Sequence, residues 1–153
     1  MTHLAAHGVE TRLPAGWEAR IFRRRDPSGA TTHAVVHAAT VPLPDERGDF
    51  GGGVVDALGP EDVFVTIIEF HPDAAASALF RSDGIPRALR PRDFDTHALQ
   101  RALPGQAGAQ VFFRHRGRAW CLYAVIGSHR NRVRLVGRVN EVLGGIDLDG
   151  GGP

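Results

Sequence analysis

The stretch VFFRHRGRAWCLYAVIGSHRNRVRLVGRVNEVL, residues 111–143, decides the fold of this chain. Its first part contains two apolar runs, 111–115 and 119–126, which are joined by a polar turn around Gly117. Glycine suits a tight turn, and the flanking arginines keep its tip in water. The second run is apolar on both alternating sets of residues, which is typical of a central strand buried on both faces. The sequence therefore predicts a hairpin in the middle of a sheet.

An amphipathic helix is expected after this hairpin, over residues 131–143. Ser128 or Asn131 can cap its start by accepting backbone N–H groups, and Gly144 with Gly145 ends it. The residues that recur at helical spacing are Val133, Val136, Val139, Asn140 and Leu143. We expect the helix to pack across the sheet through Val136, Val139 and Leu143.

Three further segments have the composition of strands: 18–24, 32–40 and 62–70. The first two are joined by Asp26-Pro27-Ser28-Gly29, a good turn sequence, and such short links favour antiparallel pairing. Short helices are expected within 54–58, 74–80 and 97–103. The predicted fold class is α+β: a single antiparallel sheet of about five or six strands, covered by the C-terminal helix and shorter helices, as in an α/β/α sandwich.

Length and composition indicate one globular domain. The 153 residues, with 42% hydrophobic and 23% charged side chains, are ordinary for a domain with its own core. We assign residues 13–148 to that domain, 1–12 to a flexible N-terminal arm and 149–153 to a flexible tail. No run approaches about 18 consecutive apolar residues, so we expect no membrane span. No apolar run of signal-peptide length is found near the N-terminus, so we expect a cytoplasmic protein.

The net charge and the cysteine content indicate no particular class of binding partner. The net charge is +1, so nothing in the overall balance calls for nucleic acid. All 18 basic residues are arginine, which indicates a high-GC bacterial genome first and selection for anion contacts second. The single cysteine, Cys121, excludes an intrachain disulfide and lies in the apolar second run, where a buried, unreactive thiol is expected.

Titratable residues within the predicted strands have structural explanations. His33 and His37 are four residues apart, but four residues along a strand span about 13 Å, too far for two ligands of one ion. We therefore expect partly exposed strand histidines and no metal site. Glu69 lies between apolar neighbours in a predicted strand. A buried glutamate is costly unless it is paired, so we expect an arginine partner or an edge position.

The longest irregular passage is the loop 41–53, in which prolines exclude helix and the run Gly51-Gly52-Gly53 keeps the backbone permissive. Glycines can let backbone N–H groups approach a phosphate, but no Gly-Lys-Ser/Thr follows. A flexible or tightly turned loop is the better interpretation. No Ser-His-Asp or Cys-His arrangement can be proposed from spacing, so no catalytic residue and no cofactor is predicted.

The opening motif Leu13-Pro14-Ala15-Gly16-Trp17, followed by a hairpin, later strands and a closing strand-turn-helix, resembles the Mog1/PsbP-like group of α/β/α sandwich proteins. That resemblance implies a sheet whose last strand is followed by a covering helix. Members of the group are mostly binding or assembly factors rather than enzymes. The Gly-rich loop 48–53 departs from the group, and no site is carried over from it.

Two functional hypotheses follow. The first is a non-enzymatic protein-interaction or assembly domain with a protein partner or a second copy of itself, because binding residues tend to lie on irregular loops of a rigid scaffold. The alternative is a small-ligand binder or enzyme that uses the loop 41–53 as a lid over a pocket. Glu69 could line such a pocket. The candidate binding residues on these loops are Asp49, Phe50, Phe80, Arg87, Arg90 and Arg92.

Overall fold

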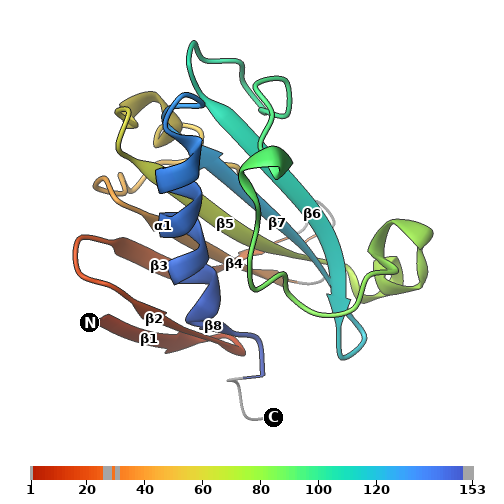
Figure 1. Cartoon of the computed structure of the whole chain (residues 1–153). Helices are drawn as coiled ribbons and strands as arrows, with labels where there is room; N and C mark the ends of the chain where they lie inside the picture. Colours follow the sequence, from red (N-terminus) through yellow and green to blue (C-terminus); the bar gives the residue numbers. More distant parts are fainter. Residues whose placement is uncertain (1, 26–28, 30–31, 150–153) are drawn as a thin grey trace.

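The computed structural model describes residues 2–25, 29 and 32–149, and its largest element is a five-stranded antiparallel sheet (Figure 1). The strands in spatial order are β3 (Glu18–Arg25), β4 (Thr32–Ala39), β5 (Val63–Phe70), β7 (Arg118–Ile126) and β6 (Ala107–His115). They correspond to the five segments that the sequence predicts, except that β6 begins at Ala107, before the expected start at 111. Of the turn expected at 26–29, residues 26–28 lie outside the described residues. Every residue of β7 from Ala119 to Ile126 is buried, which confirms the prediction of a strand enclosed on both faces.

A second, three-stranded sheet replaces the arm expected over residues 1–12, so the fold is α+β with two sheets rather than one. It is formed by β1 (Thr2–Ala6), β2 (Val9–Leu13) and β8 (Ile146–Asp147), in the order β1-β2-β8 (Figure 1). In β2, Val9, Thr11 and Leu13 are buried and alternate with more exposed residues. This alternation covers only five residues, and β8, one partner of β2, lies at the opposite end of the sequence. The local pattern was therefore too short to predict a strand.

The helix α1 (Arg132–Gly144) packs across the five-stranded sheet as expected, with Val136, Val139 and Leu143 buried. Leu135 and Val142 complete this face. Val133, which has the same helical spacing, is instead 76% exposed. At about 3.6 residues per turn, Val133 points to the side of the helix opposite Val142, away from the buried face.

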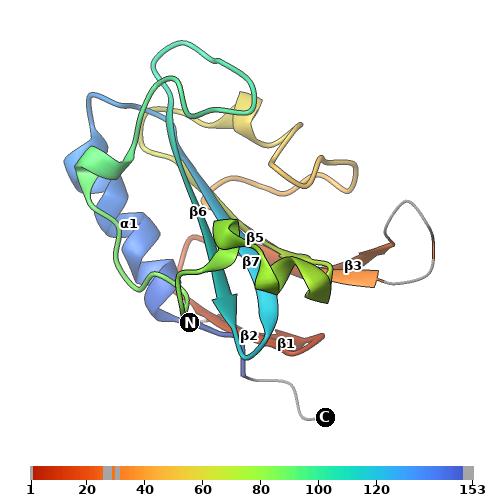
Figure 2. The ribbon, with the colours of Figure 1, turned by 90° about the vertical axis from the view of Figure 1, so that its right-hand side faces the viewer.

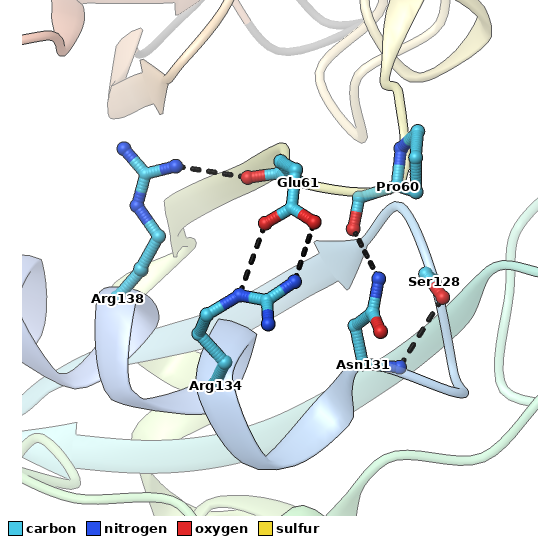
Figure 3. A network of polar contacts seen from close by, with 6 residues as sticks. All are labelled: Pro60, Glu61, Ser128, Asn131, Arg134 and Arg138. Atoms are coloured by element: carbon cyan, nitrogen blue, oxygen red, sulfur yellow. Dashed lines mark hydrogen bonds and ion pairs between the residues drawn. The ribbon is translucent and has the colours of Figure 1, made fainter.

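The start of α1 is held against the segment before β5 (Figure 3). The Ser128 hydroxyl accepts a hydrogen bond from the Asn131 N–H at 3.2 Å, whereas the Asn131 side chain donates to the Pro60 carbonyl at 3.1 Å. Arg134 forms an ion pair with Glu61, and Arg138 donates to the Glu61 carbonyl at 2.8 Å. Exposed pairs of this kind contribute at most about 1 kcal/mol each, so they orient the helix more than they stabilise it.

Short 3₁₀ helices occupy the connections: Val55–Ala57, Pro72–Ala76, Ala78–Phe80 and Pro91–Asp93. The helix expected over 97–103 is absent from this described segment, which consists of bends and turns. The chain there is held as a loop because Asp95 forms an isolated bridge with Gly108 of β6. Within the described residues, no helix has the length and apolar character needed to cross a membrane.

The two faces of the large sheet are covered differently (Figure 2). Alternate residues such as Trp120, Leu122 and Ile67 pack with α1 in the main core. The opposite set, including Phe64, Tyr123 and Val125, packs beneath the loop 41–58. We call this second side the loop face. The face that bears Tyr123 and Val125 is thus covered by a loop rather than by a second long helix.

Candidate functional site

A pocket of about 260 Å³ opens on the loop face of the large sheet. One wall is the segment 48–56, the other is the segment 99–106, and Tyr123 and Val125 of β7 form the floor. The central strand places both floor residues on this side because they are two apart. The other large apolar side chains in the lining are those of Phe50, Val55 and Leu99. The strand, the Gly-rich loop and the loop before β6 thus converge on one cavity.

Tyr123 contacts both walls. Its ring meets the half-buried ring of Phe50 edge to face, with centroids 5.6 Å apart and planes at 76°. Its hydroxyl accepts a hydrogen bond from the Gln100 N–H at 2.9 Å. Burial raises the pKa of Tyr123, and the hydrogen bond from Gln100 only partly opposes this. The phenol is therefore neutral at physiological pH and can serve as a donor or an acceptor.

Gln106 lines the pocket and is almost fully buried between its two walls. The residue is 5% exposed, and its Nε2 donates to the Val55 carbonyl at 2.8 Å. Its Oε1 is buried without a hydrogen-bond partner. Leaving such an acceptor unpaired costs on the order of 1–3 kcal/mol. The amide joins the two walls through its hydrogen bond to Val55.

The charged side chains that line the pocket are already paired. Asp56 and Arg101, one from each wall, form an ion pair at 3.0 Å across the mouth, where both are exposed. Asp49 pairs with Arg24 of β3 at 2.6 Å. These pairs neutralise both lining carboxylates, so the cavity presents no unmatched charge to a ligand.

His37 anchors the loop to the sheet. It is fully buried in β4, and its Nδ1 accepts from Arg47 Nε at 2.7 Å. The proton therefore lies on Nε2, which donates to the Asp49 carbonyl at 2.9 Å. Burial, assisted by the nearby Arg47 charge, lowers the pKa of His37 from 6.5 to about 4, so the ring is neutral at physiological pH. The neutral imidazole holds the lid beside Phe50.

The strand register places a polar row beneath the same loop. His37 lies opposite Thr66, and Thr66 lies opposite Tyr123, so three adjacent strands each contribute one polar residue at the same level. Thr66 is fully buried, and its hydroxyl has no hydrogen-bond partner. Burying polar groups in the middle of a sheet is unfavourable. The three side chains thus form one polar row across β4, β5 and β7.

Close packing explains why the loop contains glycines. Gly51 has φ +90°, and a Cβ at this position would lie 2.6 Å from the Phe64 ring. The N–H groups of Gly48 and Gly51 donate to carbonyls within the loop itself. The structure therefore has the tightly turned loop that the sequence favoured over a phosphate cradle.

The structure brings only two of the candidate binding residues together. Asp49 and Phe50 line the pocket, as the lid hypothesis expected. Phe80 is 4% exposed and packs against Phe70 and Phe112, so it offers no surface for a partner. Arg87 donates to the carbonyls of Leu143 and Ile146 and thereby ties down the end of α1. Arg90 and Arg92 are exposed and lie outside the pocket.

The isolated titratable residues have structural roles. Glu69 pairs with Arg118 at 2.7 Å, and the Arg118 guanidinium lies 4.6 Å from the centroid of Trp120, which confirms the expected arginine partner. Glu69 does not line the pocket. His33 and His37 are both buried, so the expectation of partly exposed histidines was wrong. The loop face is more completely covered than alternation in β4 alone indicated.

The residues that complete the pocket were not predicted from the sequence. Gln106, Leu99 and Gln100 belong to a segment that the sequence analysis assigned to a short helix and its end. Only the strand register places Tyr123 beside Thr66, and only the folded loop places it beneath Phe50. Comparison of the chain with protein-family models, curated proteins and solved structures finds no match.

Proposed function

We propose that this protein binds a small, predominantly apolar molecule in the pocket beneath Phe50, with the loop 41–53 as its lid. The observation that carries the proposal is the cavity itself, which has a mainly aromatic and aliphatic lining and a few polar residues. Concave, mostly apolar sites with a few placed polar groups are the usual form of ligand sites in proteins.

The dimensions of the pocket support a ligand of fragment size. Its volume of about 260 Å³ lies just below the range of roughly 300–1,000 Å³ that holds drug-sized molecules. The anchoring of the lid by His37, Arg47 and Asp49 supports a site whose cover stays ordered around a bound molecule.

Binding is favoured over catalysis by the state of the ionisable groups. Asp49 and Asp56 are neutralised by arginines, and Tyr123 has a raised pKa. Burial raises the pKa of Cys121 to about 11, and this thiol does not line the pocket. A nucleophile or general base works best with a pKa near the working pH, and burial moves the pKa values of Tyr123 and Cys121 further above it.

The interaction-domain hypothesis and the resemblance to the Mog1/PsbP-like group stay predictions. Leu79 and Val133 are the large hydrophobic residues exposed within the described part of the chain, and they lie on different elements. A protein-binding surface is usually marked by a contiguous apolar patch. The pocket therefore supports a ligand-binding function more directly.

A thermal-shift screen with a library of neutral one-ring and two-ring compounds tests the proposal. A ligand of the native state must raise the melting temperature by mass action. Leu99→Trp should fill the pocket from its half-buried wall and abolish the shift given by each hit. Leu79→Trp makes the same change at a 56% exposed position and should leave the shift intact. A library without hits, or hits that bind Leu99→Trp unchanged, would contradict the proposal.

A further inference from the structure

We infer that the lid over the pocket is an acid-sensitive gate: protonation of His37 releases the lid from the sheet and lets a bound molecule leave. This inference rests on the proposed function and adds the regulation of the same site. It begins from the attachment of the lid. Both ring nitrogens of His37, a fully buried residue of β4, form hydrogen bonds to the lid, one with Arg47 and one with the backbone at Asp49. We call these two contacts the latch.

The latch forms only with a neutral imidazole. Nδ1 accepts a hydrogen bond from Arg47 Nε at 2.7 Å, so this nitrogen carries no proton. A proton added there removes the acceptor and places two positive charges at hydrogen-bond distance. Their repulsion is weakly screened because His37 is fully buried, and the charged ring also needs water that the closed lid excludes. Protonation therefore favours a state in which the lid has moved away from β4.

The charged groups around the latch favour release over accommodation of a proton. They are Glu18, Arg20 and Arg24 on β3, and Asp45, Arg47 and Asp49 on the lid. Burial lowers the pKa of His37 most, and the hydrogen bond to the Asp49 carbonyl opposes this. The positive charge of Arg47 lowers that pKa by more than the Asp49 carboxylate raises it. The Asp49 carboxylate is in turn paired with Arg24 at 2.6 Å.

The strands on either side of His37 do not supply a counter-charge at its level. Arg20 of β3 and Thr66 of β5 lie opposite it in the strand register. Glu18, two residues from Arg20, accepts a hydrogen bond from the Leu43 N–H at 2.8 Å, at the start of the lid. A charged His37 would thus lie between an arginine and an uncharged hydroxyl group.

Release of the latch uncovers the pocket. Phe50 directly follows Asp49, and its ring lies against the Tyr123 ring of the floor, with centroids 5.6 Å apart. The N–H groups of Gly48 and Gly51 donate to carbonyls within the lid and do not hold it to the sheet. Without the latch this glycine-rich turn loses its order, because glycine restricts the backbone least. Phe50 then leaves the floor, and the pocket opens.

Acid should increase opening of the lid over a defined pH interval. The pKa of His37 is about 4 with the lid closed and returns towards 6.5 when the ring is in water. Protons therefore favour the open lid as the pH falls below 6.5, and the effect ends near 4, where the closed form is also protonated. From pH 7.5 to pH 5 the equilibrium constant for opening should increase about 30-fold. Carboxylates stay mainly ionised in that interval.

Amide hydrogen exchange of the ligand-free protein measures this opening. Protection factors of the Gly48 and Gly51 N–H groups are determined at pH 7.5 and pH 5, after correction for the intrinsic exchange rate. We expect both to fall about 30-fold in the wild type. His37→Gln keeps a donor and an acceptor but cannot titrate, so its protection factors should not fall. His97→Gln, at an exposed position, should behave as the wild type does.

Indole, a neutral two-ring probe that does not titrate in this interval, measures the consequence for the pocket. Its rate constants for association and dissociation are measured by NMR exchange spectroscopy with the full chain. Both should increase about 30-fold from pH 7.5 to pH 5, because the probe passes through the open lid. The dissociation constant should change less than about twofold, because the closed lid remains the dominant state at both pH values. His37→Gln should show neither acceleration.

The outcomes separate the inference from the proposed function. Protection factors and indole rates that do not respond to pH in the wild type overturn the inference and leave the pocket as a binding site. A response that persists in His37→Gln also overturns it. Where that variant does not fold, Arg47→Met removes the donor at a half-buried position and should increase opening at pH 7.5 about tenfold, so unchanged opening overturns the inference. Absence of indole binding counts against the proposed function, and amide exchange then still decides whether the lid is gated.

Discussion

Replacing His37 with glutamine should flatten the dependence of stability on pH between about pH 4 and 6.5. Burial lowers the pKa of this histidine from 6.5 to about 4 in the folded protein. The unfolded chain therefore binds more protons in that interval, so stability is fully present above pH 6.5 and is lost as the pH falls towards 4. His37→Gln keeps a donor for the Asp49 carbonyl but cannot titrate.

The size of the effect follows from the same shift. One pKa unit corresponds to about 1.4 kcal/mol, so the change from 6.5 to about 4 corresponds to a loss of about 3 kcal/mol on full protonation. Such a loss is a large part of the total stability of a typical domain, which is about 5–15 kcal/mol. It should therefore be readily measurable as a change in the free energy of unfolding.

Urea unfolding at intervals from pH 7.5 to pH 4 measures the effect. Carboxylates titrate in both proteins, so the difference between the wild-type and His37→Gln curves isolates the histidine. His97→Gln, at an exposed position, provides the matched control and should follow the wild-type curve. Parallel curves for the wild type and His37→Gln would show that His37 is not the buried neutral anchor of the loop.

The packing of α1 and of the loop gives two further predictions. Val139→Asp should lower the free energy of unfolding by several kcal/mol in urea titrations, because it places an unpaired charge against the sheet, whereas Val133→Asp at a 76% exposed position should change it little. Gly51→Ala should lower the melting temperature more than Gly84→Ala: both positions have positive φ, but only at Gly51 would the new Cβ meet the Phe64 ring. Equal losses within either pair would contradict the assigned packing.

The sequence predicted the elements whose patterns are long and local. The nine residues of β7 are almost uniformly apolar, and α1 has a helical repeat bounded by Ser128 and Gly145, so both could be identified without knowledge of the fold. The sheet β1-β2-β8 could not be identified in this way. Its strands are short, and β2 pairs with β8 from the other end of the chain, an arrangement that no local window contains.

The candidate site was predicted only in part, again because the sequence reveals local patterns but not contacts between distant segments. Composition identified the loop with Asp49 and Phe50 as a possible lid, because proline and glycine exclude regular structure there. The opposite wall depends on how the segment before β6 crosses the sheet, which long-range contacts such as Gln106 with Val55 determine. The sequence wrongly predicted a helix over 97–103, because Leu99 and Leu103 have helical spacing. In the structure both side chains instead pack against the core beneath the loop, so the role of this segment as a pocket wall was missed.

The measurement that tests the central claim most directly is the map of backbone amide chemical shifts as indole is titrated into the full chain. If the pocket beneath Phe50 is the ligand site, saturable changes should be concentrated in the segments 48–56 and 99–106 and around Tyr123 of the floor. They should be absent from β1 and from the exposed face of α1. Changes that are confined to those other surfaces, or that rise linearly without saturation, would contradict the assignment of this pocket as a binding site.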